Sequence, residues 1–196
     1  MSETKKKQSS LIVLAECAVM LALSIVLSFI TIYEMPMGGK ITLFSMLPIC
    51  LIAVKYGPRQ GVGVAALYML FQLVESLIKG NVFVYTVGFA AVIVCVLFDY
   101  VFPFTCLGFA GLLRKRGNAG ILCGISLVVI FRFICHYVTG VVIWGQWAPE
   151  GMGKFLYSLI YNGQYMLPEL VITVVLAAVL INIPQMRKLL DLPAKK

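Results

Sequence analysis

Six predominantly apolar stretches, joined by short polar turns, occupy almost the whole chain. A helix needs roughly 20 apolar residues to cross about 30 Å of hydrocarbon, so a series of such stretches predicts a membrane-embedded bundle. Composition agrees, because 61% of the residues are hydrophobic and 12% are charged, against roughly 45–50% and about 25% in soluble domains. The sequence therefore predicts an all-α integral membrane protein.

The stretches predict six transmembrane helices in one domain, because glycine, proline and asparagine turns separate them. The expected helices cover residues 11–33, 41–54, 61–78, 84–113, 119–144 and 155–183. The second is short and contains Pro48, so we expect it to be tilted, kinked or partly re-entrant. The transmembrane domain then spans residues 11–184, between basic cytoplasmic tails at 1–10 and 185–196.

Positive charge is distributed unevenly between the two sides of this bundle. Six crossings put both termini on one side, and that side holds all 16 Lys and Arg residues except Lys40, Lys79, Lys154 and the intramembrane Arg132. Cytoplasmic loops carry an excess of Lys and Arg, so both termini are expected in the cytoplasm of a bacterial cell. Topology and attraction to anionic membrane lipid explain the net charge of +8, so no nucleic-acid partner is expected.

Several kinds of chemical site are missing from the sequence. The six cysteines lie in apolar stretches without a CxxC pair and are interpreted as small hydrophobic residues. The single histidine has no partner at metal-ligand spacing. No GxxxxGK[ST] run is present, so energy from ATP must come through a partner. We therefore expect no catalytic residue, no metal and no cofactor, and the chain is not expected to be an enzyme.

Polar residues concentrate in the last two apolar stretches, and polar groups this costly to bury in lipid usually mark a site. A ladder with a spacing of four, about 18 Å long on a helix, consists of Arg132, His136, Gly140 and Trp144. A second stripe consists of Ser158, Asn162, Tyr165 and Glu169. If the two helices are antiparallel neighbours, Trp144 lies near Ser158 and Arg132 near Glu169, which makes a polar, aromatic cleft.

Asp99 lies deep in the fourth stretch, at a depth similar to that of Arg132 and Glu169. Arg132 is interpreted as one half of an ion pair, with Glu169 or with Asp99 as its partner. Two acids and one base leave residual negative charge. We therefore expect the spare carboxylate, above all Asp99, to bind a cationic ligand, with Trp144 and a tyrosine as aromatic faces. His136 is either a satisfied core histidine or a ligand contact.

Three segments carry a resemblance to a known family. The run at residues 136–146 is followed by Tyr-Ser and Asn-Gly pairs within residues 157–163, and residues 35–48 and the Phe-Asp-Tyr at 98–100 complete the pattern. This pattern resembles ThiT, the thiamine-specific substrate-binding (S) components of energy-coupling factor (ECF) vitamin transporters. The resemblance covers nearly the whole chain.

The resemblance implies an ECF S-component-like bundle that captures external thiamine with high affinity in a pocket closed by the first loop. Carried over by position, the pocket residues are Asp99, Tyr100, His136, Gly140, Trp144, Tyr157 and Asn162. It also implies partnership with an ECF transmembrane subunit and two ATPase subunits, which alone use ATP. Some relatives have glutamate in place of Asp99, and tryptophan and glutamate in place of Gly39 and Leu43, so the lid contacts match less closely.

A small-residue face on the first helix consists of Ala15, Ala18 and Ala22. Such a face lets another helix approach closely. It is interpreted either as internal packing or, by resemblance to the family's AxxxA motif, as the docking site for the transmembrane subunit.

Three alternative functions remain at this point. The first is an S component for a related vitamin or for the pyrimidine precursor of thiamine. The second is a stand-alone transporter driven by protons through Asp99, His136 and Glu169. A membrane enzyme with His136 as general base is the third, and it lacks a convincing nucleophile or metal. The absence of inverted repeats counts against the proton-driven transporter.

Overall fold

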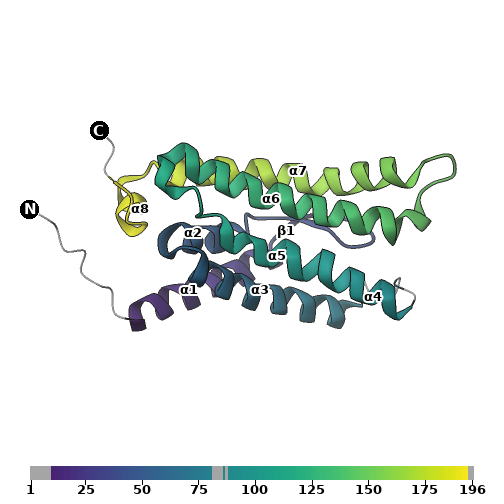
Figure 1. The fold of residues 1–196 in the computed structure, drawn as a ribbon, viewed down its shortest axis with the longest axis horizontal. Coiled ribbons are helices and arrows are strands. Elements are labelled where there is room, and N and C mark those ends of the chain that lie inside the picture. The colour runs from purple at the N-terminus through teal and green to yellow at the C-terminus, as the bar shows by residue number, and fades with distance from the viewer. Residues whose placement is uncertain (1–9, 81–85, 87, 194–196) are drawn as a thin grey trace, which may run out of the picture.

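The chain folds into an elongated bundle whose helices lie roughly along one axis (Figure 1). The computed structural model describes residues 10–80, 86 and 88–193. The long helices are α1 (Ser10–Phe29), α3 (Pro58–Lys79), α6 (Gly117–Val142) and α7 (Lys154–Leu180). The short ones are α2 (Leu47–Tyr56), α4 (Phe89–Cys95), α5 (Phe102–Thr105) and α8 (Pro184–Leu189). The predicted all-α class is confirmed.

Among the described residues, five helical segments are long and apolar enough to cross a bilayer. They are Ser10–Phe29, Pro58–Lys79, Phe89–Phe109, Arg114–Val142 and Lys154–Leu180. Large apolar side chains such as Leu70, Phe131 and Val175 point outward from them, and contiguous apolar surface of this kind suits contact with lipid. Five of the six expected helices therefore have the length of a membrane span.

The second expected helix differs from its prediction. Helix α2 has 10 residues, about 15 Å at 1.5 Å per residue and half of the hydrocarbon thickness. Its residues from Leu47 to Lys55 are all buried, because α1, α3 and the segment near Gly108 surround it. The second expected pass is thus completed by a short helix enclosed in the bundle.

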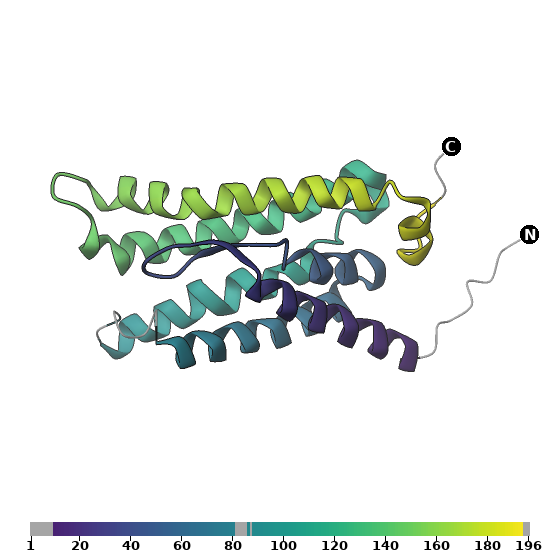
Figure 2. The same cartoon turned by 180° about the vertical axis from the view of Figure 1, so that it is seen from behind.

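A β-hairpin accounts for the missing length. Strand β1 (Thr31–Glu34) pairs antiparallel with β2 (Lys40–Thr42), where the sequence had predicted helix at 31–33 and from 41 onward. Gly38 and Gly39 adopt φ values of +89° and +87°, which only glycine adopts freely, so the chain turns back there. Figure 2 shows the hairpin running from the middle of the bundle toward the end where α6 and α7 join. The first two passes are therefore part helix and part strand.

The fourth expected helix changes its winding at the acidic residue. Between α4 and α5 lies a π-helical segment, Val96–Val101, that contains Asp99 and Tyr100. Pro103 is the second residue of α5. Because proline has no N–H, it leaves the Asp99 carbonyl, four residues earlier, without its α-helical donor. π-Helical turns are frequent at functional sites. The expected start of this helix at residue 84 lies outside the described residues.

The predicted terminal tails are only partly described. Residues 1–9 and 194–196 lie outside the described ranges, and helix α8 occupies part of the expected tail at 185–196. Arg187 of α8 is buried and donates to the carbonyl of Ile181 at 2.7 Å and to Asn118 at 2.9 Å. These bonds attach α8 to the ends of α6 and α7.

Close backbone packing at Gly61 yields the first prediction. An added Cβ at Gly61 would lie 2.5 Å from the Gly108 carbonyl oxygen and 2.7 Å from Ala53 Cβ, and overpacking of this kind costs about 1–3 kcal/mol. Gly61→Ala is therefore expected to lower the unfolding temperature in detergent, measured by circular dichroism. Gly63→Ala is the matched control, because nothing lies within 4 Å of its added Cβ. Equal unfolding temperatures for the two variants would contradict this packing.

Candidate functional site

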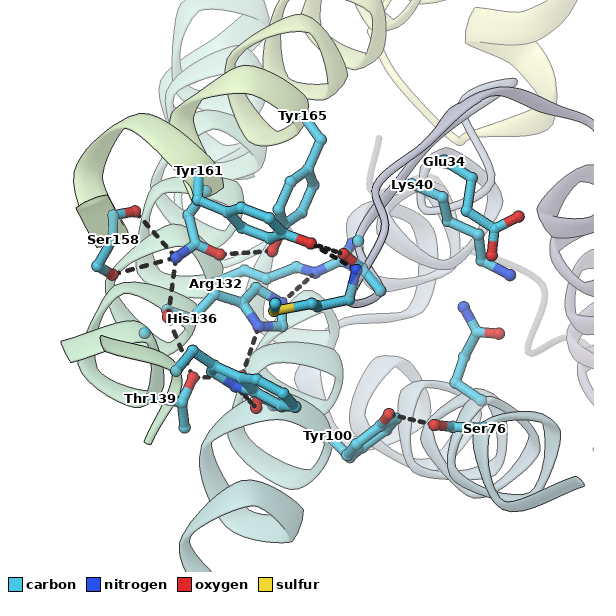
Figure 3. Close-up of a pocket in the computed structure, with 18 of the residues that line it drawn as sticks. Glu34, Lys40, Ser76, Tyr100, Arg132, His136, Thr139, Ser158, Tyr161 and Tyr165 are labelled. Atoms are coloured by element: carbon cyan, nitrogen blue, oxygen red, sulfur yellow. Dashed lines mark hydrogen bonds and ion pairs between the residues drawn. The ribbon is translucent and has the colours of Figure 1, made fainter. Parts of the chain in front are cut away.

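A cavity of about 140 Å³ lies between the hairpin and helices α3, α6 and α7. All seven residues that the resemblance had implied line it: Asp99, Tyr100, His136, Gly140, Trp144, Tyr157 and Asn162. Figure 3 shows its two sides, with Ser158, His136 and Thr139 on one and Ser76, Tyr100 and Lys40 on the other. Residues that are far apart in the sequence are thus gathered around one space.

Asp99 accepts four hydrogen bonds at this cavity. Its Oδ1 accepts hydrogen bonds from His136 Nδ1 at 2.9 Å and from the hydroxyl of Thr139. Its Oδ2 accepts only long bonds, from Trp144 Nε1 and Cys95 Sγ, both at 3.4 Å. Hydrogen bonds weaken at such lengths, so Oδ2 is the oxygen that retains capacity for a ligand.

The geometry fixes the tautomer of His136. Arg132 Nε–H donates to His136 Nε2 at 3.3 Å, and because guanidinium has no acceptor, Nε2 must be unprotonated. The ring proton then lies on Nδ1 and is donated to Asp99. His136 is therefore a neutral imidazole that connects Arg132 to Asp99.

The interpretation of Arg132 and Glu169 as a direct ion pair is corrected by the structure. Arg132 contacts His136 and Met46 Sδ, and its guanidinium lies 4.4 Å from the Phe104 ring centroid. Glu169 Oε1 instead accepts from the backbone N–H and the hydroxyl of Thr42, at 2.5 and 2.7 Å. The alternative pairing with Asp99 is not direct either, because the imidazole lies between the two groups.

Helix register explains why this pair does not meet. Helices α6 and α7 pack side by side, as expected (Figure 1). However, Ser158 donates to the carbonyl of Tyr137 at 2.8 Å, and Asn162 donates to that of His136 at 3.1 Å. Helix α6 ends at Val142, and a 3₁₀ turn, Trp144–Trp147, follows it. The observed register is therefore about one helical turn away from a simple count inward from the loop.

The seam between α6 and α7 depends on the absence of a side chain at Gly140. A Cβ at that position would overlap Ser158 Oγ and lie 2.9 Å from Asn162 Nδ2. Asn162 Nδ2 donates to the carbonyls of Ser158 and His136, and its Oδ1 accepts from Tyr165 at 2.8 Å. Asn162 therefore shapes the cavity wall, because its polar atoms are occupied by the protein.

The hairpin closes the cavity through contacts with both halves of the bundle. Tyr161 of α7 accepts from the N–H of Met37 at 3.0 Å and donates to the carbonyl of Gly38 at 2.9 Å. On the opposite side, Lys40 pairs with Glu75 of α3 at 2.9 Å. The first loop is thus a lid that bridges two helices, and no tryptophan takes part in it.

Several lining residues were missed by the sequence analysis. Those on α3 are Gln72, Glu75, Ser76 and Lys79, and their spacing of three and four forms a polar stripe that could have revealed them. Thr139 and Tyr161 also line the cavity and gave no comparable signal, whereas Tyr165 had been expected from the second stripe. Three acids, Glu34, Glu75 and Asp99, and three bases, Lys40, Lys79 and Arg132, line the cavity. Glu169 does not line it. The expected residual negative charge is therefore wrong for this cavity.

Comparison with known proteins gives three findings. The profile of a family described as Thiamine transporter protein (Thia_YuaJ) matches residues 14–188. Similar proteins include thiamine transporter ThiT of Bacillus subtilis, 28% identical over 93% of this chain and 97% of that protein, and ThiT of Lacticaseibacillus paracasei, 24% identical over 92% of each. A solved structure of ThiT from Listeria monocytogenes gives a TM-score of 0.68 at 24% identity, over 93% of this chain and 98% of that one. This last likeness supports the fold.

The tautomer of the single histidine can be observed directly. In tag-free protein labelled with ¹⁵N-histidine, the NMR spectrum is expected to show a protonated Nδ1 and an unprotonated Nε2. In Arg132→Met, Nε2 loses its donor, so its resonance should move toward that of a nitrogen without a hydrogen bond. A proton found on Nε2 in the unmodified chain would contradict the Arg132–His136–Asp99 arrangement.

Proposed function

The chain belongs to the thiamine transporter protein (Thia_YuaJ) family, and from this premise we propose that it binds thiamine in the cavity beneath the hairpin. As a member of a transport family it is a multi-pass membrane protein and not an enzyme. The observation that carries the proposal is the position of Asp99: a carboxylate whose side chain is 12% exposed, with one weakly bonded oxygen, lies beside the indole N–H of Trp144.

The thiazolium ring of thiamine is permanently cationic and suits this corner of the cavity. A carboxylate and an aromatic face are the groups that attract such a cation in a water-poor site. The neutral state of His136 matters here, because an imidazolium would repel the ligand. Arg132 is separated from Asp99 by the imidazole, so its charge is held one ring away from Oδ2.

The aminopyrimidine ring of thiamine requires hydrogen-bonding groups. The Tyr157 hydroxyl contacts only Met37 Sδ, at 3.8 Å, among the described residues, and a thioether is a weak acceptor. Tyr157 is therefore available to a ring nitrogen or the amino group of the ligand. The same features would accept the pyrimidine precursor of thiamine, but that precursor lacks the cation that Asp99 is placed to bind.

The chain is proposed to act as the S component of an ECF-type importer, with a separate transmembrane subunit and two ATPase subunits as partners. The proposal includes no cofactor of its own, since ATP would be used only by the partners. Its support is α1, on which Ala15, Ala18 and Ala22 are all exposed. Internal packing does not use these alanines, so the small-residue face is open to another helix. With cytoplasmic termini, the hairpin end faces outward and receives external ligand.

The stand-alone proton-driven transporter is less well supported. Its proposed path needs Asp99, His136 and Glu169 in one connected series. Glu169 instead bonds to Thr42 outside the cavity lining, and the proton of His136 is already donated to Asp99.

Thiamine titration tests the binding proposal. Trp144 lines the cavity and Trp147 does not, so Trp147→Phe leaves one reporter for tryptophan fluorescence. Saturable quenching at nanomolar concentration is expected, and Asp99→Asn should weaken binding by roughly tenfold or more, because it removes the carboxylate charge. A flat fluorescence response together with no heat in calorimetry would refute thiamine binding. Full affinity in Asp99→Asn would refute the cation site alone.

Docking to a transmembrane partner is tested by Ala18→Trp. The indole would hold the partner helix away, so uptake in cells that supply the other subunits should be lost while thiamine binding is retained. Val175→Trp on α7 is the matched control, because Val175 is exposed and lies far from the alanine face in sequence. Loss of binding in Ala18→Trp would assign this face to internal packing, and unimpaired uptake would place the docking surface elsewhere.

A further inference from the structure

A chain of buried hydrogen bonds connects Glu169 on α7 to the cavity wall on α3. Thr42 donates to Glu169 Oε1 at 2.7 Å, and its hydroxyl oxygen lies 2.7 Å from that of Ser45. Tyr68 donates to Ser45 at 3.1 Å, and Gln72 Nε2 donates to the Tyr68 oxygen at 3.1 Å. None of the five side chains is more than 8% exposed, so bulk water has little access to the chain.

The direction of every bond in this chain follows from its first member. Glu169 Oε1 accepts both the backbone N–H of Thr42 at 2.5 Å and the Thr42 hydroxyl at 2.7 Å. A hydroxyl has a single hydrogen. With that hydrogen given to Glu169, Thr42 can only accept from Ser45.

The single hydrogen of each hydroxyl can be followed in the same way toward the cavity. The Ser45 hydrogen is used on Thr42, and Ser45 accepts the hydroxyl of Tyr68 at 3.1 Å. The Tyr68 hydrogen is used on Ser45, so the Tyr68 oxygen must accept from Gln72, and only the Nε2 end of that amide can donate. Gln72 Oε1 takes no part in this bond, because Nε2 is the end of the amide that faces Tyr68. It is buried and has no hydrogen-bond partner among the described residues.

We propose that Gln72 Oε1 is a binding group that accepts a hydrogen bond from the hydroxyl of the ligand's hydroxyethyl arm, and that Glu169 sets its orientation through this chain. The inference rests on thiamine as the ligand. Gln72 lines the cavity from α3, and Figure 3 shows Ser76 of the same helix on the side opposite Ser158. A ligand whose aminopyrimidine lies against α6 and α7 and whose cation lies at Asp99 directs its remaining arm toward α3.

A buried acceptor without a partner costs free energy until the ligand supplies a donor. The preference should therefore show as discrimination between ligands. Calorimetry compares thiamine with an analogue in which the hydroxyethyl arm is replaced by ethyl. The unmodified chain is expected to bind thiamine about tenfold more tightly than the analogue. Gln72→Met, similar in length and without an acceptor oxygen, should reduce this ratio to near one.

The role of the chain is tested at Thr42, which does not line the cavity. Thr42→Val keeps the backbone bond to Glu169 but removes the hydroxyl, so the amide of Gln72 is free to turn and the ratio should fall several-fold. Thr42→Ser restores the hydroxyl and should restore the ratio. If Thr42 only holds the lid in place, both ligands weaken equally in Thr42→Val and the ratio stays unchanged, which would overturn the orienting role.

The unmodified chain provides a test that needs no variant. Equal affinity for thiamine and the analogue would overturn the hydroxyl contact while leaving thiamine binding intact. Failure to bind either ligand would refute the proposed function and this inference with it. An unchanged ratio in Gln72→Met would assign the discrimination to another residue.

Discussion

Polar groups inside a bilayer have no water to satisfy them, and this constraint governs the arrangement of the whole bundle. The backbone satisfies its own polar groups by forming helices, and it forms a hairpin only where other elements enclose it. Polar side chains form hydrogen bonds with one another and with the backbone. Asp99 accepts four hydrogen bonds, and Asn162 bonds to α6, to its own helix and to Tyr165. The cavity therefore lies where several internally hydrogen-bonded polar clusters meet.

The hairpin is the element that borders the cavity on the side of the first loop. It is held at its base by Glu169, at its tip by Tyr161 and at its side by Glu75. Because these anchors come from α7 and α3, the hairpin spans the two halves of the bundle above the cavity.

The charge that a ligand meets at the site depends on how the charged side chains pair with one another more than on how many of them line the cavity. The cavity has as many basic as acidic lining residues, yet Lys40 and Lys79 both pair with Glu75, and Arg132 is turned toward His136 and Phe104. Asp99 is left with hydrogen-bond donors and no direct ion pair among the described residues. A cationic ligand would thus meet a carboxylate at one place in a neutral cavity, which favours a defined orientation over general attraction.

The sequence by itself determined the membrane class and five of the six expected spans, because apolar length is a local property of the chain. Four-residue spacing also placed Arg132, His136, Gly140 and Trp144 on one face, and all four line the cavity. The sequence did not determine the hairpin at 31–42, since the strands exist only where Glu169, Tyr161 and Glu75 receive them. Nor did it determine the register of α6 on α7, which the close approach at Gly140 and the 3₁₀ turn after Val142 decide. That shift of about one turn separates Arg132 from Glu169 and frees Glu169 for the lid. Contacts between distant segments are set by packing in three dimensions, and only the tertiary structure decided them.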